Sequence, residues 1–182
     1  MASQSIKKLA ELFSKFPTVG QRTAQRFVFY LIKQPKEKIE EIILSIQDLK
    51  NKIIYCSFCF NPFEVNGYAS AHSINSEQTG LAQVNLCEIC RDAARDKSIL
   101  CIVEKEQDFE SIEKTKKYKG LYFILGGNIA TLKKEEKNGI RLKELEERLR
   151  SPQSYGIITI FKEIIVATNP TPEGMATAMA VE

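Results

Sequence analysis

The apolar positions in the first third of the chain recur with the period of α-helices. Three apolar stripes predict helices at about residues 6–13, 21–33 and 36–52, separated by a turn at 16–20 and by Pro35. We expect each stripe to pack in a core. The stripes consist of Ile6, Leu9, Ala10, Leu12 and Phe13, then Ala24, Phe27, Val28 and Leu31, then Ile39, Ile42, Ile43, Ile46, Leu49 and Ile53.

The C-terminal half shows a different pattern, in which short apolar runs alternate with amphipathic segments. The runs at 99–103, 120–125 and 163–168 predict strands, and the segments at about 109–117, at 142–149 and from Met175 onward predict helices, with a lysine-rich loop at 128–140. This alternation is typical of a parallel sheet, so the whole chain is predicted to be an α+β protein with more than one domain.

Polar residues follow two of the predicted strands. Glu104 comes after the first strand, and the turn at 169–174 comes after the third. Because ligands bind beyond the carboxyl ends of strands in open parallel sheets, we expect Glu104 and this turn to face each other across one site.

Two Cys-x-x-Cys motifs carry the strongest chemical signal in the chain. Cys56 with Cys59 and Cys87 with Cys90 give four thiolates, which is the ligand set of a structural, tetrahedral zinc site. The alternatives are a pair of disulfides or ordinary buried cysteines. Residues 60–86 form a linker longer than the roughly 12–20 residues usual for such sites.

The remaining cysteine and the single histidine have simpler interpretations. His72 lies inside the long linker and could replace a cysteine as a ligand, although a solvent-exposed loop histidine is the simpler interpretation. Cys101 lies in an apolar run and is interpreted as a buried strand residue.

The turn at 17–20 lies between two predicted helices and is followed by basic residues. Gly20 would leave backbone N–H groups at the start of the second helix facing outward, which favours anion binding. Arg22 and Arg26 are four residues apart and therefore share one face of that helix. This pattern fits a helix-hairpin-helix that grips DNA phosphates without reading bases, and it fits a plain helical connection with surface arginines equally well.

Composition narrows these interpretations. With 182 residues, 43% hydrophobic and 27% charged, the chain has the composition of a soluble globular protein of one to three domains. It has no apolar run long enough to span a membrane and no secretory signal at its start, so the paired cysteines favour a metal over disulfides. The net charge of +3 does not by itself predict nucleic-acid binding.

Five motifs in this order resemble the RecR family of recombination mediators over nearly the whole chain. They are residues 16–26 (FPTVGQRTAQR), 55–59 (YCSFC), 87–92 (CEICRD), 120–127 (GLYFILGG) and 167–174 (ATNPTPEG). The resemblance implies a helix-hairpin-helix domain at 1–54, a four-cysteine zinc finger at 55–91 and a Toprim domain at 92–182.

The resemblance also implies a function and partners. Family members act with RecO and RecF in recombinational DNA repair, load recombinase onto gapped single-stranded DNA, and assemble into dimers and tetrameric rings. The expected protein is cytoplasmic, associated with the bacterial nucleoid, and binds DNA without sequence preference. Gly20, Arg22 and Arg26 match the DNA-binding hairpin, and Glu104 matches the Toprim glutamate in a region linked to RecO contact.

The same resemblance implies that the chain is not an enzyme. Catalytic Toprim enzymes carry two aspartates where this chain has Asn169 and Thr171, so only Glu104 and Glu173 remain as carboxylates. Magnesium requires hard anionic oxygen ligands, and this pair would hold it weakly. The alternative is a magnesium-dependent Toprim nuclease or topoisomerase-like enzyme.

The chain departs from the family pattern in three places. Thr18 replaces the first hairpin glycine, the linker between the two cysteine motifs is expanded, and the sequence stops at Glu182, where the family continues with more of the Toprim sheet. We therefore expect a Toprim domain that is incomplete at its C-terminus, with an unpaired strand edge and uncertain ring closure.

Overall fold

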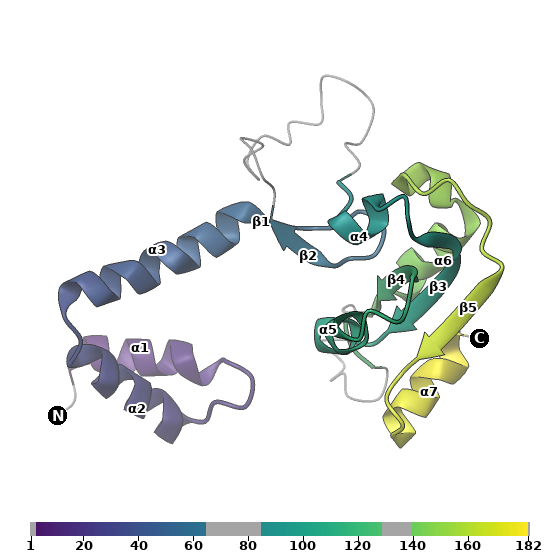
Figure 1. Cartoon of the computed structure of the whole chain (residues 1–182). Coiled ribbons are helices and arrows are strands. Elements are labelled where there is room, and N and C mark those ends of the chain that lie inside the picture. The colour runs from purple at the N-terminus through teal and green to yellow at the C-terminus, as the bar shows by residue number, and fades with distance from the viewer. Residues whose placement is uncertain (1–2, 65–84, 129–139, 182) are drawn as a thin grey trace. The chain divides into compact units, whose positions relative to one another are not determined.

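Figure 1 shows the computed structural model of the chain, which describes residues 3–64, 85–128 and 140–181. Internal contacts divide the chain into two compact units, here called the N-terminal unit (Met1–Asn51) and the C-terminal unit (Lys52–Glu182). His72 and most of the loops predicted at 60–86 and 128–140 lie outside the described residues.

The N-terminal unit is helical, as the apolar periodicity predicted. It consists of α1 (Gln4–Ser14), α2 (Gln21–Ile32) and most of α3 (Lys36–Lys52). Helices α1 and α2 pack against each other, and the ring of Phe13 makes edge-to-face contacts with Phe16 and Phe27. Only Ala24 and Val28 are buried among the described residues of this unit.

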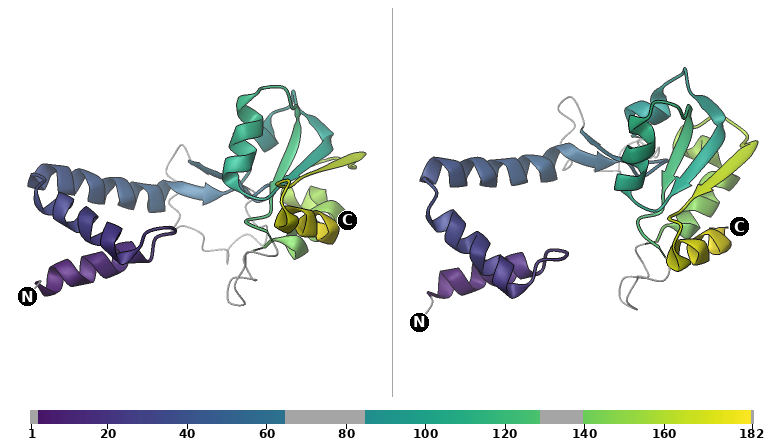
Figure 2. Two further views of the ribbon diagram at one scale, coloured as in Figure 1. Left: turned by 90° about the horizontal axis from the view of Figure 1, so that it is seen from below. Right: turned by 60° about the horizontal axis from the view of Figure 1, so that its bottom comes forward.

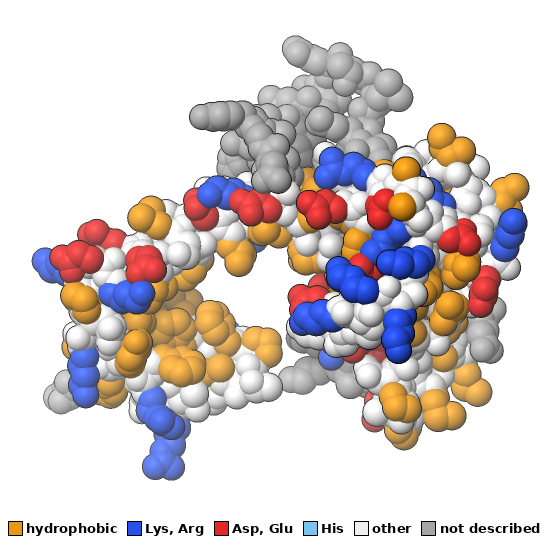
Figure 3. Space-filling model, in the orientation of Figure 1, with side chains coloured by type: hydrophobic (Ala, Val, Ile, Leu, Met, Phe, Trp, Pro, Cys, Tyr) orange, Lys and Arg blue, Asp and Glu red, His pale blue; other side chains and the backbone are white. Residues whose placement is uncertain are grey.

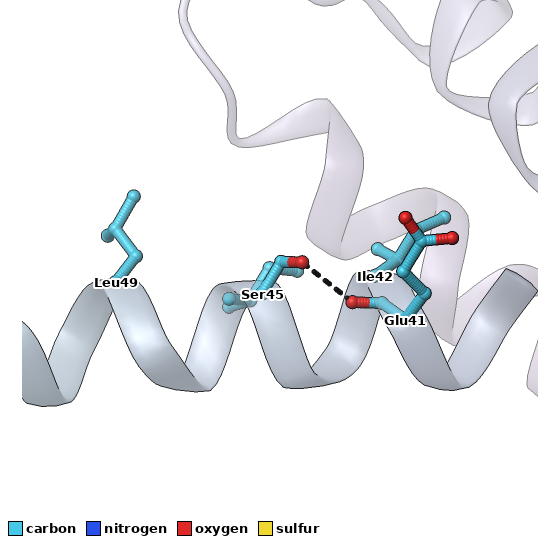
Figure 4. A pocket seen from close by; sticks show the side chains of 5 residues that line it. Glu41, Ile42, Ser45 and Leu49 are labelled. Carbon is cyan, nitrogen blue, oxygen red and sulfur yellow. Dashed lines mark hydrogen bonds between the residues drawn. The ribbon is translucent and has the colours of Figure 1, made fainter.

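The expectation that the stripe of α3 packs in a core is wrong for this unit. No residue of α3 is buried, and Ile43, Ile46 and Leu49 are among the exposed large apolar side chains. A shallow groove of about 270 Å³ runs along this stripe, and all of its lining residues come from α3 itself (Figure 4). The helical periodicity of the apolar residues determines which of them share a face of α3. It does not show whether another element packs against that face.

The C-terminal unit begins with a small hairpin and continues as an α/β sheet. Its elements in chain order are β1 (Ile53–Tyr55), β2 (Pro62–Glu64), α4 (Glu88–Arg91), β3 (Asp96–Val103), α5 (Glu106–Lys114), β4 (Gly120–Ile124), α6 (Leu142–Arg150), the 3-10 helix η2 (Pro152–Tyr155), β5 (Glu163–Ala167) and α7 (Pro172–Val181). The main sheet has the order β4-β3-β5, and both pairings are parallel, as predicted.

Side chains of β3 alternate between the two faces of the sheet, as the strand geometry requires. Leu100 and Ile102 join a cluster with Leu145 of α6, whereas Cys101 and Val103 join a second cluster with Phe109 of α5. Figure 2 shows α5 on one face of the sheet and α6 on the other. The sheet is therefore the middle of three layers, and strands β3 and β4 are buried on both sides.

The starts of three elements differ from the sequence prediction, and one of them is helix α7, which begins at Pro172 rather than near Met175. Helix α5 starts at Glu106 rather than near Phe109, because the side chain of Asp108 accepts a hydrogen bond from the backbone N–H of Lys105 (3.0 Å) and caps the first turn. Strand β3 starts earlier than predicted, at Asp96. Among the described helices, none is long and apolar enough to cross a membrane.

Candidate metal centre and nucleic-acid interface

The two Cys-x-x-Cys motifs meet in the C-terminal unit. Cys56 and Cys59 follow β1, and Cys87 and Cys90 lie at the start of α4 and inside it. All four are buried, and their sulfur atoms lie within 4.8 Å of one another. The cysteines also belong to the core cluster on the α6 face of the sheet, so the knuckles are part of the hydrophobic core.

The sulfur geometry fits one tetrahedral ion. Bonds of about 2.3 Å from zinc to sulfur place tetrahedral ligands about 3.8 Å apart. The Sγ atoms of Cys59 and Cys87 lie 3.6 Å apart, which matches that spacing and is far too long for a disulfide. All four cysteines are unpaired thiols, so the donor set suits a thiolate-binding metal ion.

Backbone N–H groups donate to two sulfur atoms of the cluster. The N–H of Cys87 donates to Cys56 Sγ (3.4 Å), and that of Asn61 donates to Cys59 Sγ (3.5 Å). Hydrogen bonding from the side chain of Cys59, and then from Cys87 and Cys90, lowers the pKa of the Cys56 thiol, whereas hydrogen bonding with Cys56 and Cys87 raises the pKa of the Cys59 thiol. Cys56 is therefore the thiol of the cluster that most favours the anionic form, in which sulfur ligates metals.

Cys101 is separate from the cluster. It is buried on the α5 face of the sheet, opposite the other four cysteines. Burial raises the pKa of its thiol to about 11, so it stays protonated and unreactive at neutral pH.

The turn between α1 and α2 brings the predicted hairpin residues together at the surface of the N-terminal unit. Thr18 has φ 64°, the left-handed conformation that favours glycine, whereas Gly20 has the extended values φ −80° and ψ 168°. The conformational need for glycine therefore falls on position 18, where this chain has threonine. Open space lies where a Cβ of residue 20 would project.

Gly20 is also the N-cap of α2, and no side chain caps that helix. Its first turn contains no acidic residue, Arg22 is exposed in that turn, and Arg26 is exposed one turn further along the helix. No ion pair links either arginine to a carboxylate within the described ranges. The N-terminus of α2 thus combines open backbone donors with two cationic side chains, which is suitable for binding an anion.

Glu104 and the 169–174 turn lie together at the carboxyl edge of the sheet, as expected. Glu104 is fully buried. Its carboxylate accepts hydrogen bonds from the side-chain amide of Asn169 (2.9 Å) and from the backbone N–H of the same residue (3.3 Å). An amide donor therefore satisfies the buried charge.

The rest of the turn is closed by its own hydrogen bonds. Thr171 Oγ1 accepts the N–H of Gly174 (3.2 Å), and the N–H of Thr171 donates to the carbonyl of Asn169 (2.8 Å). A Cβ at Gly174 would lie 2.0 Å from the carbonyl oxygen of Asn169, so only glycine fits. Glu173 lies half-buried in the first turn of α7.

Comparisons with known proteins agree with this architecture. The family described as "RecR, helix-hairpin-helix" matches residues 6–50, and the Toprim domain family matches residues 98–182. The chain is 35% identical over 179 residues to the "Recombination protein RecR" of Rubrobacter xylanophilus, covering 98% of this chain and 77% of that protein. The chain belongs to the RecR family.

Other bacterial members give similar values. Identity is 34% over 177 residues to the recombination protein RecR of Chloroherpeton thalassium and to that of Clostridium perfringens. Both comparisons cover 97% of this chain. They cover 77% of the Chloroherpeton protein and 76% of the Clostridium protein. The resemblance inferred from five short motifs therefore extends along almost the whole chain.

Sequence reasoning missed two arginines beside the metal centre. Arg148 is buried, and Arg141 and Arg148 both stack on the ring of Phe60, the residue that follows Cys59. One signal was present in the sequence, because position 148 falls on the apolar face of α6 three residues after the buried Leu145. An arginine on a buried stripe requires partners, and two partners of Arg148, the carbonyl of Ser57 and the ring of Phe60, come from the first knuckle.

Proposed function

We propose that this chain is a DNA-binding mediator of recombinational repair with no enzymatic activity. It would act with RecO and RecF to load recombinase onto gapped single-stranded DNA, in the bacterial cytoplasm at the nucleoid. Membership of the RecR family, whose relatives carry the name recombination protein, supports the role in recombination. The division into domains at 1–54, 55–91 and 92–182 is part of the same proposal.

The N-terminus of α2 is the observation that carries the DNA-binding proposal. Its uncapped donors, the open space at Gly20 and the exposed Arg22 and Arg26 form one cationic surface. Such a surface would contact DNA of any sequence, because backbone N–H groups and cationic side chains pair with phosphate oxygens, which carry no sequence information.

The four cysteines are proposed to hold one structural Zn²⁺. Four thiolates leave no open coordination position, and a closed site of this kind stabilises a fold and performs no chemistry. The position of the cysteines within the core cluster supports the structural role.

The Glu104 site is proposed to serve as a vestigial Toprim site and a partner-binding region, with Asn169, Thr171 and Glu173, rather than as a catalytic centre. The amide of Asn169 donates to the carboxylate that a divalent cation would otherwise contact. Hard cations need several anionic oxygens, and an amide donor in this place opposes their binding. We associate this edge of the sheet with RecO contact.

Self-association into dimers and tetrameric rings completes the proposal. Large apolar side chains cover much of the N-terminal unit (Figure 3), with 43–61% exposure for Leu12, Phe16, Phe27, Phe29, Tyr30, Ile32, Ile43, Leu44, Ile46 and Leu49. Apolar surface of this extent marks an interaction site more often than a free surface. A second copy of the chain would cover it.

The DNA-binding surface can be tested by removing its two charges. The double substitution Arg22→Ala/Arg26→Ala should weaken binding to single-stranded DNA of any sequence. It should also flatten the dependence of log Kd on log salt concentration by about 1.4, since each lost phosphate contact removes about 0.7 on single strands. Fluorescence anisotropy across a salt series measures both effects.

The matched control removes two charges beyond the other end of α2, at its C-cap Lys33 and at Lys36, the first residue of α3. Lys33→Ala/Lys36→Ala should leave the salt dependence close to that of the wild type. Equal slopes for the two double variants would exclude the α2 N-terminus as the binding surface. Magnesium-dependent nicking of DNA by the wild type that Glu104→Gln abolishes would instead establish the enzymatic alternative.

A further inference from the structure

Phe60 occupies an unusual backbone position in the first knuckle. It follows Cys59 directly and has φ 62°, in the left-handed region that bulky side chains rarely adopt. Its N–H donates to the carbonyl of Cys56 (3.1 Å), and the N–H of Cys56 donates to the carbonyl of Asn61 (3.0 Å), so the strained residue closes the turn. Glycine would adopt this conformation without strain. The presence of phenylalanine therefore calls for a compensating interaction.

Two arginines on or next to α6 supply that interaction. The guanidinium carbons of Arg141 and Arg148 lie 4.6 and 4.8 Å from the centroid of the Phe60 ring. The stack continues on both sides, with Arg148 over Tyr155 (3.8 Å) and Arg141 over Tyr55 (5.7 Å). Cations within about 6 Å of an aromatic face attract it, most strongly where water is excluded.

The same arginines hold the backbone on either side of the ring. Arg148 donates to the carbonyl of Ser57 (3.2 Å), which lies between Cys56 and Cys59. Arg141 donates to the carbonyl of Ile124 (3.0 Å), and the N–H of Ile124 in turn donates to the carbonyl of Cys59 (3.0 Å). Two hydrogen bonds therefore attach the knuckle, one to α6 and one to the end of β4, and Arg141 links that strand end to the start of α6.

Arg148 is specialised for this contact. It is buried with only 7% exposure, and its Nε has no hydrogen-bond partner within the part of the chain that the structure describes. Its remaining donors are shared between Ser57 and groups of its own helix, Glu144 and Glu147. A buried cation is costly unless it is compensated, and here the Glu147 carboxylate (3.2 Å) and the faces of the Phe60 and Tyr155 rings surround the guanidinium group.

We propose that Phe60, held by Arg141 and Arg148, positions the first pair of metal ligands, so that residues which never touch the ion determine how tightly it is held. The inference rests on the proposed metal centre. Groups that orient ligands from outside typically change metal affinity by about 10–100-fold when they are removed. Binding of the ion and the docking of α6 then become one coupled event.

The test is the rate at which the metal-loaded protein releases Zn²⁺ to an excess of chelator. Phe60→Leu keeps an apolar side chain and the same backbone strain but removes the aromatic face, and it should release zinc about tenfold faster. Phe60→Tyr keeps the aromatic face and should release zinc at the wild-type rate. Equal rates for Phe60→Leu and wild type would overturn the proposal, as would a Phe60→Tyr rate equal to that of Phe60→Leu.

A second matched pair tests the arginines. Arg148→Met keeps the length of the side chain but loses the guanidinium, and it should also release zinc at least tenfold faster. Arg150→Met removes a surface arginine of the same helix that is 77% exposed and bonded to Glu146, and it should have no effect. If Arg148→Met does not fold, Arg148→Lys, which keeps the charge without the planar group, takes its place, and a wild-type rate would again contradict the inference.

The zinc content of purified wild type is measured first. It distinguishes a failure of the proposed metal centre from a failure of the positioning role alone. Protein without stoichiometric metal would contradict the metal centre and this inference together. Protein that holds one zinc ion but releases it at the same rate in every variant would contradict only the positioning role. Far-UV circular dichroism of each variant before chelation shows that the fold is intact.

Discussion

The two units of this chain differ in how much apolar surface they bury by themselves. In the C-terminal unit the buried side chains form two continuous clusters on opposite faces of the sheet, and the four cysteines belong to one of them. In the N-terminal unit only Ala24 and Val28 are buried among the described residues. The C-terminal unit has a core of its own, whereas the N-terminal unit exposes most of its large apolar side chains.

This difference in buried apolar surface corresponds to a difference in the kind of candidate site that each unit contains. Metal ligands need fixed positions, and the four clustered cysteines lie within a well-packed core that would provide them. The α2 N-terminus and the apolar stripe of α3 lie on a unit with little core, where their side chains are exposed. On the proposed function, the C-terminal unit is stabilised from within and the N-terminal unit gains stability by assembly.

Loss of the metal should have the largest effect and should be confined to one unit. Binding free energies of about 10–16 kcal/mol in isolated zinc-binding peptides are folding free energies, because the site does not exist in the unfolded chain. Cys59→Ser should therefore strongly reduce hydrogen-exchange protection across residues 85–128 and leave residues 3–51 unchanged. Mass spectrometry of peptides resolves the two regions, and an equal loss in both would show that the chain unfolds as a single unit.

A pair of phenylalanine substitutions tests the comparison at intermediate magnitude. Phe123→Ala removes a fully buried ring of β4 and should cost about 3–5 kcal/mol at any protein concentration. Phe29→Ala removes a ring that is 52% exposed and should cost less than about 0.5 kcal/mol in dilute protein. The stability cost of Phe29→Ala should grow with protein concentration if a second copy of the chain covers that surface.

Denaturant unfolding over a wide range of protein concentration, with the native mass from light scattering, measures both variants. A large cost of Phe29→Ala that does not change with concentration would mean that the N-terminal unit is stabilised from within. That result would remove the contrast between the two units.

The smallest expected effect concerns the hairpin turn of the N-terminal unit. Thr18→Gly relieves a left-handed conformation that costs about 1–2 kcal/mol for a residue with a Cβ, and part of that gain is lost to the greater entropy of glycine in the unfolded chain. The free energy of unfolding should rise by up to about 1 kcal/mol. Thermal unfolding of the variant checks this.

Gly20→Ala is the matched control, because residue 20 has an extended backbone and open space at its Cβ position. It should leave stability unchanged or slightly raised. Destabilisation by Thr18→Gly together with destabilisation by Gly20→Ala would mean that the glycine requirement of the turn lies at position 20.

Much of the fold follows from local patterns. The helical stripes, the three strands and the parallel alternation were predictable because period and strand length are properties of neighbouring residues. The clustering of the four cysteines was predictable because two-residue spacing brings two thiols onto one turn. The approach of Glu104 to Asn169 was predictable from the rule that strand ends share one edge of the sheet.

Other features depend on residues that are distant in sequence. The stack of Arg141 and Arg148 on Phe60 joins positions about 80–90 residues apart, and no local rule relates them. The exposure of the α3 stripe was also not predictable, because a stripe indicates a face but does not show whether anything covers it.

By itself, the sequence determined the family, the four candidate ligands and the order of elements. Each of these depends on short segments whose spacing or periodicity can be recognised without the rest of the chain. Only the tertiary structure decided that Thr18, not Gly20, takes the left-handed conformation, that the amide of Asn169 satisfies Glu104, and that the cysteines belong to the core of the sheet. The contact of Asn169 with Glu104 and the burial of the cysteines arise when distant segments pack together, and the conformation of Thr18 belongs to a turn whose residue types do not reveal it.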